Sequence, residues 1–440
     1  MGSDLPAKLA RILAGNRDTD YGLAHGFSGI GDLAAFQARV PLTTYDDYEP
    51  WIAAIRAGGA GVLTAEPVLL LHPSSGSTAP SKLIPYTAGL RAEFAGALRT
   101  WLTDLVRHFP GLRGGAAYFT ITPPTLPPDL GPSRVPIGFA DDTFYLDPWL
   151  GEQVAARLVT PAGLDESMEM DDFWDATVAA LLGARNVRFV SVWNPTFLLI
   201  LLEHAGVAPA RLFPDLEVIS CWADGNSRSA AERVRRLFPG VHVQPKGLLA
   251  TEGVVTIPVE GLGKRLTSAH FFEFETDDGD IRLPDQLVAG RQYGVVMTTS
   301  GGLYRYRLGD VVEYRGRACF EFVGKAAGVS DRFGDKLNEV HVRRVVGGAA
   351  GFRLLVPEDD RYVLYTDDPL DPEAIDAGLR ENFHYDLCRA LGQLKPVRVV
   401  VVDDGDEQYV DNCLGFGMRL GDIKPMTLSA RSGWVFRPRS

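Results

Sequence analysis

The sequence has few cysteines and no long apolar segment. Its four cysteines are far apart in the chain: Cys221, Cys319, Cys388 and Cys413. Such spacing indicates neither a zinc site nor a disulfide framework, and it is typical of a reducing compartment. The longest apolar runs have about six residues, whereas roughly 20 are needed to span a bilayer. The first 15 residues include Lys8 and Arg11 and lack the apolar core of a signal peptide. These absences predict a cytoplasmic protein that is not inserted in a membrane.

The patterns that define several common enzyme classes are also missing. No GxSxG sequence occurs, which argues against the usual serine hydrolase. No GxGxxG follows a strand-like run, and no GxxxxGK[ST] occurs, so a dinucleotide-dependent dehydrogenase and a P-loop NTPase are both disfavoured. The histidines lack HxxxH or HxH spacing, so we expect no catalytic zinc held by the protein.

Positive charge is the minority sign. The 440 residues include 44 Lys and Arg against 56 Asp and Glu, giving a formal net charge of −12. This balance argues against nucleic acid or an anionic membrane as the main partner, although a basic pocket can lie within an acidic protein. Hydrophobic residues make up 46% of the chain, as in a folded globular protein. The length suits two or three domains. Nothing in the sequence indicates an oligomeric state.

Apolar strand-like runs alternate with segments of helical period, which predicts an α/β fold. The expected strands before residue 250 are 67–72, 81–86, 186–192, 216–222 and 241–244, and the expected helices are 87–109, 196–205 and 229–238. Residues 1–15 are expected to contain a short amphipathic helix with Leu5, Leu9 and Ile12 on one face.

The pattern changes after about residue 324. Residues 352–356 and 361–365 flank an acidic turn and predict a hairpin, 372–391 predicts one amphipathic helix, and 397–402 predicts an apolar strand. The small residues from Gly324 to Gly328 suit a hinge. We therefore expect a large N-terminal domain of mixed sheets and helices, residues 1–324, and a small mobile C-terminal α+β cap, residues 325–440.

A hydroxyl-rich loop between two expected strands is the strongest chemical signal. It consists of Ser74, Ser75, Gly76, Ser77 and Thr78, and Lys82 follows it. Backbone N–H groups and hydroxyls around a glycine suit phosphate oxygens, and a lysine adds positive charge. The alternative is an ordinary Ser/Gly turn.

Three further positions carry charged groups in turn-like surroundings. Glu252 follows a strand and suits Mg²⁺, which takes one or two protein carboxylates together with phosphates. The alternation of Tyr and Arg at 304–307 predicts a strand with one basic face, and Asp310 follows it in a turn. The two carboxylate oxygens of Asp310 suit the hydroxyls of a ribose. Lys424 lies in a turn that contains a glycine, and such a turn would let its ammonium group move toward a bound anion. Each also has a plain alternative as a solvated surface residue.

Taken together, the order and spacing of these motifs resemble the adenylate-forming superfamily. Within it, the chain is most similar to the auxin-responsive acyl acid amido synthetase family and its shorter bacterial members. The similarity runs from about residue 40 to the end. Its characteristic segments are 40–48 (VPLTTYDDY), 72–78 (HPSSGST), 82–87 (KLIPYT), 306–310 (YRLGD) and 335–339 (DKLNE).

The resemblance implies a two-step reaction. A carboxylate attacks the α-phosphate of ATP to give an acyl-adenylate and pyrophosphate, and an amine or amino acid then displaces AMP to form an amide. An acyl-CoA ligase using the same intermediate is one alternative. A non-catalytic protein that binds a nucleotide or a small acid is another.

The resemblance also assigns roles to residues. The hydroxyl loop and Lys82 would hold the phosphates, Thr251 would lie beside the α-phosphate, and Glu252 would contact Mg²⁺. Asp310 would bind the ribose, and Lys424 would be the mobile lysine of the adenylation step. The adenine loop would be Asp224, Gly225 and Asn226, with Leu248 where relatives often have an aromatic residue and Lys325 where they usually have arginine.

An apolar acyl pocket is expected near the ends of the predicted strands. Its candidate residues are Phe119, Thr120, Phe139, Trp193, Phe197 and Trp222. Each is also a plausible core residue. Their character favours a small monocarboxylic, aromatic acid as the substrate. Arg134 and His270 are the candidates to receive a second carboxylate if the acid has one.

Overall fold

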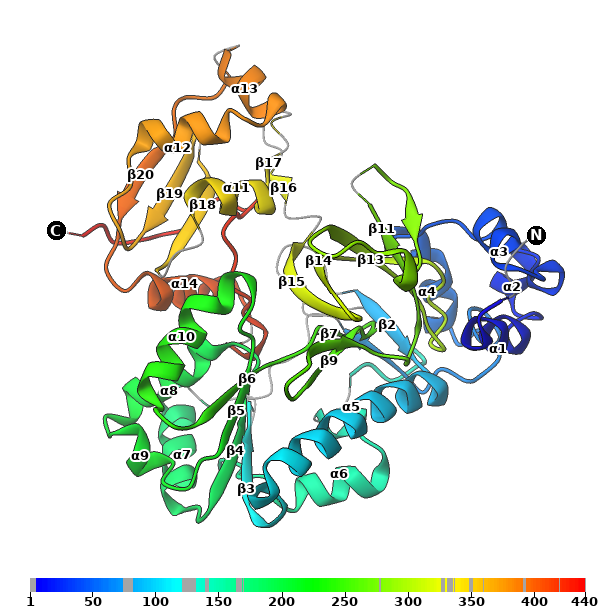
Figure 1. Cartoon of the computed structure of the whole chain (residues 1–440), viewed down its shortest axis with the longest axis horizontal. Coiled ribbons are helices and arrows are strands. Elements are labelled where there is room, and N and C mark those ends of the chain that lie inside the picture. Colours follow the sequence, from blue (N-terminus) through cyan, green and yellow to red (C-terminus); the bar gives the residue numbers. More distant parts are fainter. Residues whose placement is uncertain are drawn as a thin grey trace. The chain divides into compact units, whose positions relative to one another are not determined.

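The structure is a computed structural model of the chain. It describes residues 5–73, 82–120, 132–138, 142–163, 168, 170–276, 278–325, 329–330, 335, 337–347, 351–358, 360–390, 393–418 and 420–439. Two compact units are present, each built from several stretches of the chain (Figure 1). Unit 1 comprises residues 1–110, 127–157 and 247–322, and unit 2 comprises 111–126, 158–246 and 323–440. The fold is mixed α/β, as the sequence predicts. In the described part of the chain, no helix is long and apolar enough to cross a membrane. The predicted division at residue 324 into a large domain and a mobile cap stays a prediction.

Unit 1 is built on a seven-stranded sheet whose described pairs are antiparallel. Its order is β12 (Ile281–Arg282), β11 (Phe271–Glu275), β13 (Gln292–Thr298), β14 (Tyr306–Gly316), β15 (Cys319–Lys325), β10 (Gly263–Leu266) and β9 (Thr256–Val259). Two short hairpins accompany it: β1 (Leu70–Pro73) with β2 (Leu83–Tyr86), and β7 (Leu249–Ala250) with β8 (Gly253–Val254). The main helices of this unit are α1 (Ala7–Gly15), α2 (Asp20–Ala24), α3 (Leu33–Arg39), α4 (Glu49–Arg56), α5 (Ala88–His108) and α6 (Pro148–Ala155).

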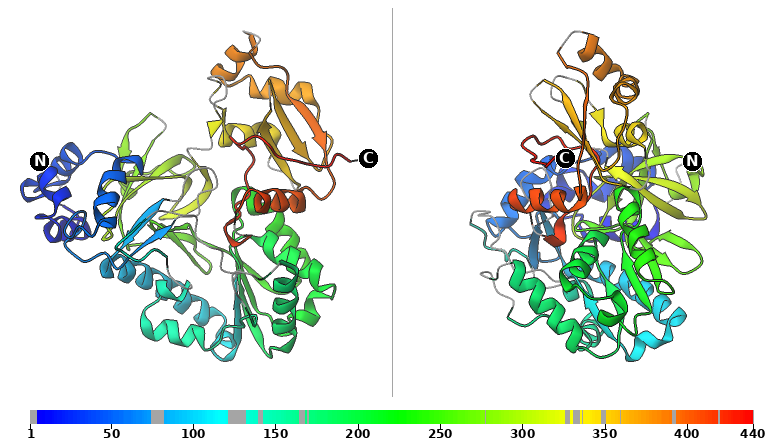
Figure 2. Two further views of the ribbon diagram at one scale, coloured as in Figure 1. Left: turned by 180° about the vertical axis from the view of Figure 1, so that it is seen from behind. Right: turned by 90° about the vertical axis from the view of Figure 1, so that its left-hand side faces the viewer.

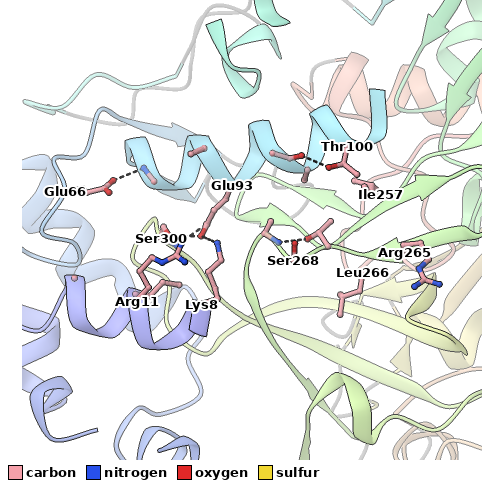
Figure 3. A pocket seen from close by; sticks show the side chains of 18 of the residues that line it. Lys8, Arg11, Glu66, Glu93, Thr100, Ile257, Arg265, Leu266, Ser268 and Ser300 are labelled. Atoms are coloured by element: carbon pink, nitrogen blue, oxygen red, sulfur yellow. Dashed lines mark hydrogen bonds and ion pairs between the residues drawn. The ribbon is translucent and has the colours of Figure 1, made fainter. Parts of the chain in front are cut away.

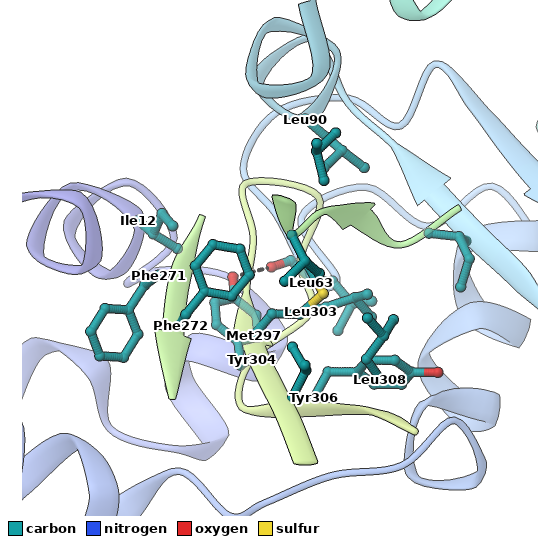
Figure 4. Packing of buried hydrophobic residues seen from close by; sticks show 14 of the residues in the cluster. Ile12, Leu63, Leu90, Phe271, Phe272, Met297, Leu303, Tyr304, Tyr306 and Leu308 are labelled. Atoms are coloured by element: carbon teal, nitrogen blue, oxygen red, sulfur yellow. Dashed lines mark hydrogen bonds between the residues drawn. The ribbon is translucent and has the colours of Figure 1, made fainter. Parts of the chain in front are cut away.

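The core of unit 1 joins these elements around large aromatic side chains. Tyr304 and Tyr306 are fully buried, and they pack with Leu63, Phe272 and Met297 (Figure 4). The predicted N-terminal and 87–109 helices are confirmed as α1 and α5. Helix α5 begins where the Thr87 side chain accepts a hydrogen bond from the Leu90 N–H, an N-cap that satisfies an otherwise orphan donor.

The expected basic face of the segment 304–307 is wrong, because both arginines are paired. Arg305 is buried and donates to Glu273 through Nε at 2.9 Å and Nη2 at 3.1 Å. Its Nη1 also donates to the Val40 carbonyl. Arg307 pairs with Glu275 nearer the surface. Both carboxylates lie on β11, far away in the sequence, so the alternation alone did not reveal them.

Glu273→Ala is expected to lower the free energy of unfolding of unit 1 by about 3–5 kcal/mol, because it leaves the Arg305 guanidinium buried without its counter-charge. Glu275→Ala is the matched control on the same strand. It should cost less than about 1 kcal/mol, since the Arg307 side chain is 38% exposed. Urea denaturation of the two variants measures their free energies of unfolding. Equal losses would show that the buried ion pair stabilises unit 1 no more than the exposed one.

Unit 2 contains a four-stranded parallel sheet in the order β3 (Ala116–Phe119), β4 (Val187–Ser191), β5 (Val218–Cys221) and β6 (His242–Pro245). The helices that share a hydrophobic core with this sheet are α7 (Met170–Gly183), α8 (Pro195–Ala205), α9 (Pro209–Leu212) and α10 (Arg228–Leu237). Helices α8 and α10 lie side by side (Figures 1 and 2). Asn194 caps α8, and Gly206 ends it in the left-handed conformation that favours glycine. The predicted strands and helices of this region are confirmed.

The C-terminal part of unit 2 has a second, three-stranded sheet. Its order is β18 (Arg353–Pro357), β19 (Tyr362–Thr366) and β20 (Arg398–Val401), with β20 parallel to β19. The remaining helices are α11 (Glu339–Val346), α12 (Pro372–Leu379), α13 (Phe383–Ala390) and α14 (Gly405–Gly415). The single helix expected over 372–391 is wrong. The chain breaks after α12, and Asn382 restarts it by accepting a hydrogen bond from the Tyr385 N–H.

Candidate active site

A tight hairpin in unit 1 carries Glu252. Strands β7 and β8 pair antiparallel, and Thr251 and Glu252 form the turn between them. Tyr86 Oη donates to the Thr251 carbonyl at 2.6 Å, which ties the turn to β2. Gly253 is needed here because a Cβ at this position would clash with the His270 ring. The Glu252 side chain is therefore held in a fixed, buried turn and is not a solvated surface glutamate.

A line of three polar groups leads from Lys82 to Glu252. Lys82 Nζ lies 3.3 Å from Tyr306 Oη, and Tyr306 Oη lies 3.4 Å from Glu252 Oε1. Burial, together with the nearby charge of Glu252, raises the pKa of Tyr306, so its phenol stays protonated and donates toward the carboxylate. The Lys82 ammonium also lies 5.8 Å from the centroid of the Tyr45 ring. The lysine and the glutamate, 170 positions apart in the printed sequence, thus share one small region.

Asp310 lies on the same strand as Tyr306, within an irregularity between Arg307 and Val311. The register between β13 and β14 shifts between Gly294 and Val296, and Gly309 has φ +80°, a left-handed conformation that favours glycine. Such a bulge redirects the side chains beside it. Asp310 is buried with 4% exposure. The Gly-Asp sequence therefore marks a built feature of the strand.

The segment 40–48, which carries part of the family resemblance, supports this strand. The Thr43 N–H donates to the Arg305 carbonyl, and the Arg307 N–H donates to the Thr43 carbonyl. Tyr48 Oη accepts from the Tyr304 N–H at 2.7 Å. The Tyr45 hydroxyl accepts from a backbone N–H beside Lys82. These contacts position the residues that face the candidate site.

A buried network behind the hairpin includes residues that the sequence did not reveal. His270 Nε2 accepts a hydrogen bond from the Val254 N–H at 3.0 Å, and its Nδ1 lies 2.9 Å from Glu93 Oε2. Glu93 also accepts from Ser300 Oγ at 2.6 Å and from Lys8 Nζ at 3.1 Å (Figure 3). Burial alone would raise the pKa of Glu93, but hydrogen bonds from His270 and Ser300 and the charge of Lys8 lower it. The imidazole links α5 to the hairpin and is fully occupied, so it does not receive a substrate carboxylate.

The ends of the parallel strands in unit 2 bring aromatic and cationic side chains together. Trp193 follows β4 and Trp222 follows β5, and their ring centroids are 6.0 Å apart. Lys424 Nζ lies 5.9 Å from the centroid of the Trp222 ring. Lys246, directly after β6, is 8% exposed; its Nζ donates to Ser191 Oγ at 2.8 Å and lies 4.7 Å from the Trp193 ring centroid. The carboxyl edge of a parallel sheet is the usual place for ligand-binding groups.

Lys246 is a candidate residue that no sequence motif singled out. The feature that could have indicated it is its position directly after a predicted strand, because open α/β sheets bind ligands at the ends of their strands. The strand itself was predicted, but the burial of the lysine depends on Trp193 and Ser191 from another strand.

The other predicted residues are distributed between the two units. Thr120 donates its N–H to the Ser191 carbonyl, and its hydroxyl is buried with no hydrogen-bond partner among the described residues. Phe119 packs edge-on against Phe189, whereas Phe197 lies in the core with Trp174.

The remaining predictions belong to nucleotide binding and the acyl pocket. Asp224 and Gly225 lie at the turn after β5, and Leu248 packs against the core of unit 1. Lys325 ends β15. Ser74, Ser75, Gly76, Ser77, Thr78 and Phe139 lie outside the described residues, as do the side chains of Asn226 and Lys325. Every assigned role in this set stays a prediction.

The described residues fit a divalent cation that is bound together with a phosphate. No group of three or more His, Cys, Asp or Glu side chains that could hold a metal occurs in the described ranges. Glu252 supplies one buried carboxylate. Mg²⁺ commonly takes one or two protein carboxylates and completes its coordination with substrate phosphates and water.

The architecture matches solved structures of two kinds of ligase. A structure titled AtGH3.15 acyl acid amido synthetase in complex with 2,4-DB has a TM-score of 0.78 and 17% identity, covering 96% of this chain and 90% of that one. A 2-hydroxyisobutyryl-CoA ligase in the postadenylation state has a TM-score of 0.57 and 14% identity, covering 91% and 87%. The chain therefore has the fold shared by acyl acid amido synthetases and acyl-CoA ligases.

Two family models narrow this assignment. The GH3 family N-terminal domain matches residues 7–205, and the GH3 family central domain matches residues 265–325. Together they cover more than half of the chain. It belongs to the GH3 family.

Curated relatives agree with the family. The probable indole-3-acetic acid-amido synthetase GH3.12 of Oryza sativa subsp. japonica is 26% identical over 409 residues, covering 70% of this chain and 66% of the relative. The putative indole-3-acetic acid-amido synthetase GH3.10 of the same plant is 25% identical over 410 residues, covering 81% and 85%. The jasmonoyl–L-amino acid synthetase JAR4 of Nicotiana attenuata is 23% identical over 381 residues, covering 70% and 66%. The chain thus spans just under two thirds of the length of GH3.12 and JAR4.

Proposed function

We propose that this chain is an ATP-dependent ligase that adenylates a carboxylic acid and transfers the acyl group to an amino acid, forming an amide. The observation that supports the proposal most is the grouping of Lys82, Tyr306 and Glu252, with Asp310 farther along the strand of Tyr306. A cation and a carboxylate held in one region suit the phosphates of a nucleotide and its metal. The names of the relatives favour an amino acid over a thiol as the acceptor.

In the first step, the acid carboxylate attacks the α-phosphorus of ATP and pyrophosphate leaves. Glu252 would hold Mg²⁺, which supplies electrostatic stabilisation of the phosphate charge when it is bound. Lys82 and the loop 74–78 would hold phosphate oxygens, Thr251 would lie beside the α-phosphate, and Asp310 would accept hydrogen bonds from the ribose hydroxyls. Lys424 would stabilise the charge that develops on phosphorus.

In the second step, the amine nitrogen attacks the acyl carbonyl carbon and the bond between that carbon and the phosphate oxygen breaks. AMP leaves with the electron pair of this bond, and the amine releases a proton to water. The small cap, residues 325–440, would move between the steps and take Lys424 away from the acyl-adenylate. Trp193 and Trp222 would form part of the acyl pocket. Because the reaction consumes ATP, we also propose that the protein acts in the cytoplasm.

The test is acid-dependent exchange of labelled pyrophosphate into ATP, with a panel of monocarboxylic acids that includes benzoate and indole-3-acetate. Mass spectrometry of reactions with amino acids or CoA then identifies the product. An amide product supports the proposal. A thioester would favour the acyl-CoA ligase, whose fold the chain shares. Nucleotide binding without exchange for any acid would favour a non-catalytic binding protein.

His270→Phe is expected to slow exchange by about 10- to 100-fold, because the hairpin that carries Glu252 loses its anchor and small displacements of catalytic groups have large effects. The Mg²⁺ concentration needed for half-maximal rate should rise at the same time. His270→Gln is the control, since its amide can accept from the Val254 N–H and donate to Glu93. If both variants keep the wild-type Mg²⁺ dependence, His270 has only a packing role.

A further inference from the structure

Unit 1 contains a cavity of about 830 Å³ that is distinct from the nucleotide-binding residues described above. Helices α1 and α5, strands β9 and β10 and the segment after β10 form its walls (Figure 3). None of Lys82, Thr251, Glu252 and Asp310 lines it. Its volume is within the range of about 300–1,000 Å³ that is usual for small-molecule sites.

The uncompensated charge of the cavity is positive. Arg11 and Arg265 both line it, and among the described residues neither guanidinium has a carboxylate partner. Figure 3 shows Arg11 beside Lys8 at one end and Arg265 at the other. Arg265 Nη1 makes a long contact of 3.9 Å to the Cys319 sulfur. Two separate guanidinium groups are therefore available to an anionic ligand.

The two carboxylates that line the cavity are already satisfied. Glu66 accepts from the Gly89 N–H at 2.7 Å, in the first turn of α5, where a negative charge is favourable. Glu93 accepts from the His270 ring, from Ser300 and from Lys8. Among the described residues, neither carboxylate forms an ion pair with Arg11 or Arg265.

Apolar side chains make up much of the rest of the wall. Ile12 from α1, Ala97 from α5, Ile257 from β9 and Leu266 from β10 line the cavity. A fully hydrated ion such as free phosphate would leave this surface unused. An organic anion with an apolar body would bury it and pair its acid group with a guanidinium, which binds carboxylates in a bidentate manner.

We propose that this cavity binds a carboxylate with an apolar body at a site separate from the nucleotide. If the proposed function holds, both the acid substrate and the acyl–amino acid product belong to this chemical class. The cavity also borders Glu93, which holds His270 and through it the hairpin of Glu252. Occupancy of the cavity therefore changes the rate of exchange.

Isothermal titration of the full chain with octanoate and with N-octanoylglycine tests the binding and distinguishes an acid from a conjugate. The double variant Arg11→Gln/Arg265→Gln should bind the preferred probe at least about 10-fold more weakly, because charge-assisted hydrogen bonds are lost. Arg17→Gln, at an exposed arginine of the same region outside the cavity, is the matched control. Octanol, which lacks the charge, should not bind measurably.

Equal affinity in the double variant and the wild type would overturn the site. Ala97→Trp, which fills the cavity, gives a second test: it should abolish binding while the thermal midpoint shows that the chain is folded. These titrations need no turnover, so failure of every acid to support exchange would refute the proposed function separately. Binding that leaves the exchange rate unchanged would overturn the link to the Glu252 hairpin.

Discussion

Lys424→Met is expected to lower acid-dependent pyrophosphate exchange by about 10²–10³-fold, the usual loss when one group that stabilises transition-state charge is removed. The backbone around this lysine is anchored without its ammonium. Asn194 Nδ2 donates to the Ile423 carbonyl at 3.0 Å, and Tyr409 Oη donates to the Lys424 carbonyl at 2.6 Å. Methionine keeps an apolar stem against Trp222, so the loss should be chemical and not structural.

Two controls separate the role of Lys424 from a general effect of charge. Lys395→Met removes an exposed lysine of the same unit, paired with Asp360, and should leave exchange unchanged. Amide formation from a synthetic acyl-adenylate should also persist in Lys424→Met, because that step follows departure of pyrophosphate. A wild-type rate of exchange in Lys424→Met would contradict the role of Lys424 in adenylation. Lys246, the buried lysine near Trp193, would then be the next candidate.

Asp310→Asn is expected to raise the KM for ATP by about 10²-fold or more, because a carboxylate that accepts from two ribose hydroxyls makes two charge-assisted hydrogen bonds. The asparagine side chain should keep the place of Asp310 on the bulge of β14, because asparagine is nearly isosteric with aspartate.

Comparison of ATP with 2′-deoxyATP makes the prediction for Asp310 specific. The wild type should use 2′-deoxyATP less well than ATP, because one hydrogen bond to Asp310 is missing. Asp310→Asn should discriminate much less between the two nucleotides. Undiminished discrimination in the variant would show that another residue holds the ribose.

The sequence predicted local structure well where one pattern decided it. The period of apolar residues was enough to place α5 and α8, and the structure adds that Thr87 and Asn194 cap them. The break between α12 and α13 was missed, because the apolar period continues through it while Asn382 redirects the backbone. Local capping chemistry competes with periodicity at such positions.

The candidate site was predicted as separate motifs, and the contacts between them needed the structure. Arg305 appeared as part of a basic face until the fold placed Glu273 against it. Glu93 and His270 lie 177 positions apart, and neither occurs in a recognisable motif. Pairings of this kind depend on how α5 packs on the sheet, which no local pattern specifies.

The central claim is that the acid carboxylate attacks the α-phosphorus of ATP, and oxygen-18 transfer tests it most directly. An acid labelled in both carboxylate oxygens is turned over with ATP and an amino acid, and the products are weighed by mass spectrometry. We predict one labelled oxygen in AMP, one in the amide and none in pyrophosphate. Label in inorganic phosphate together with formation of ADP would contradict the account, because the acid would then have attacked the γ-phosphorus.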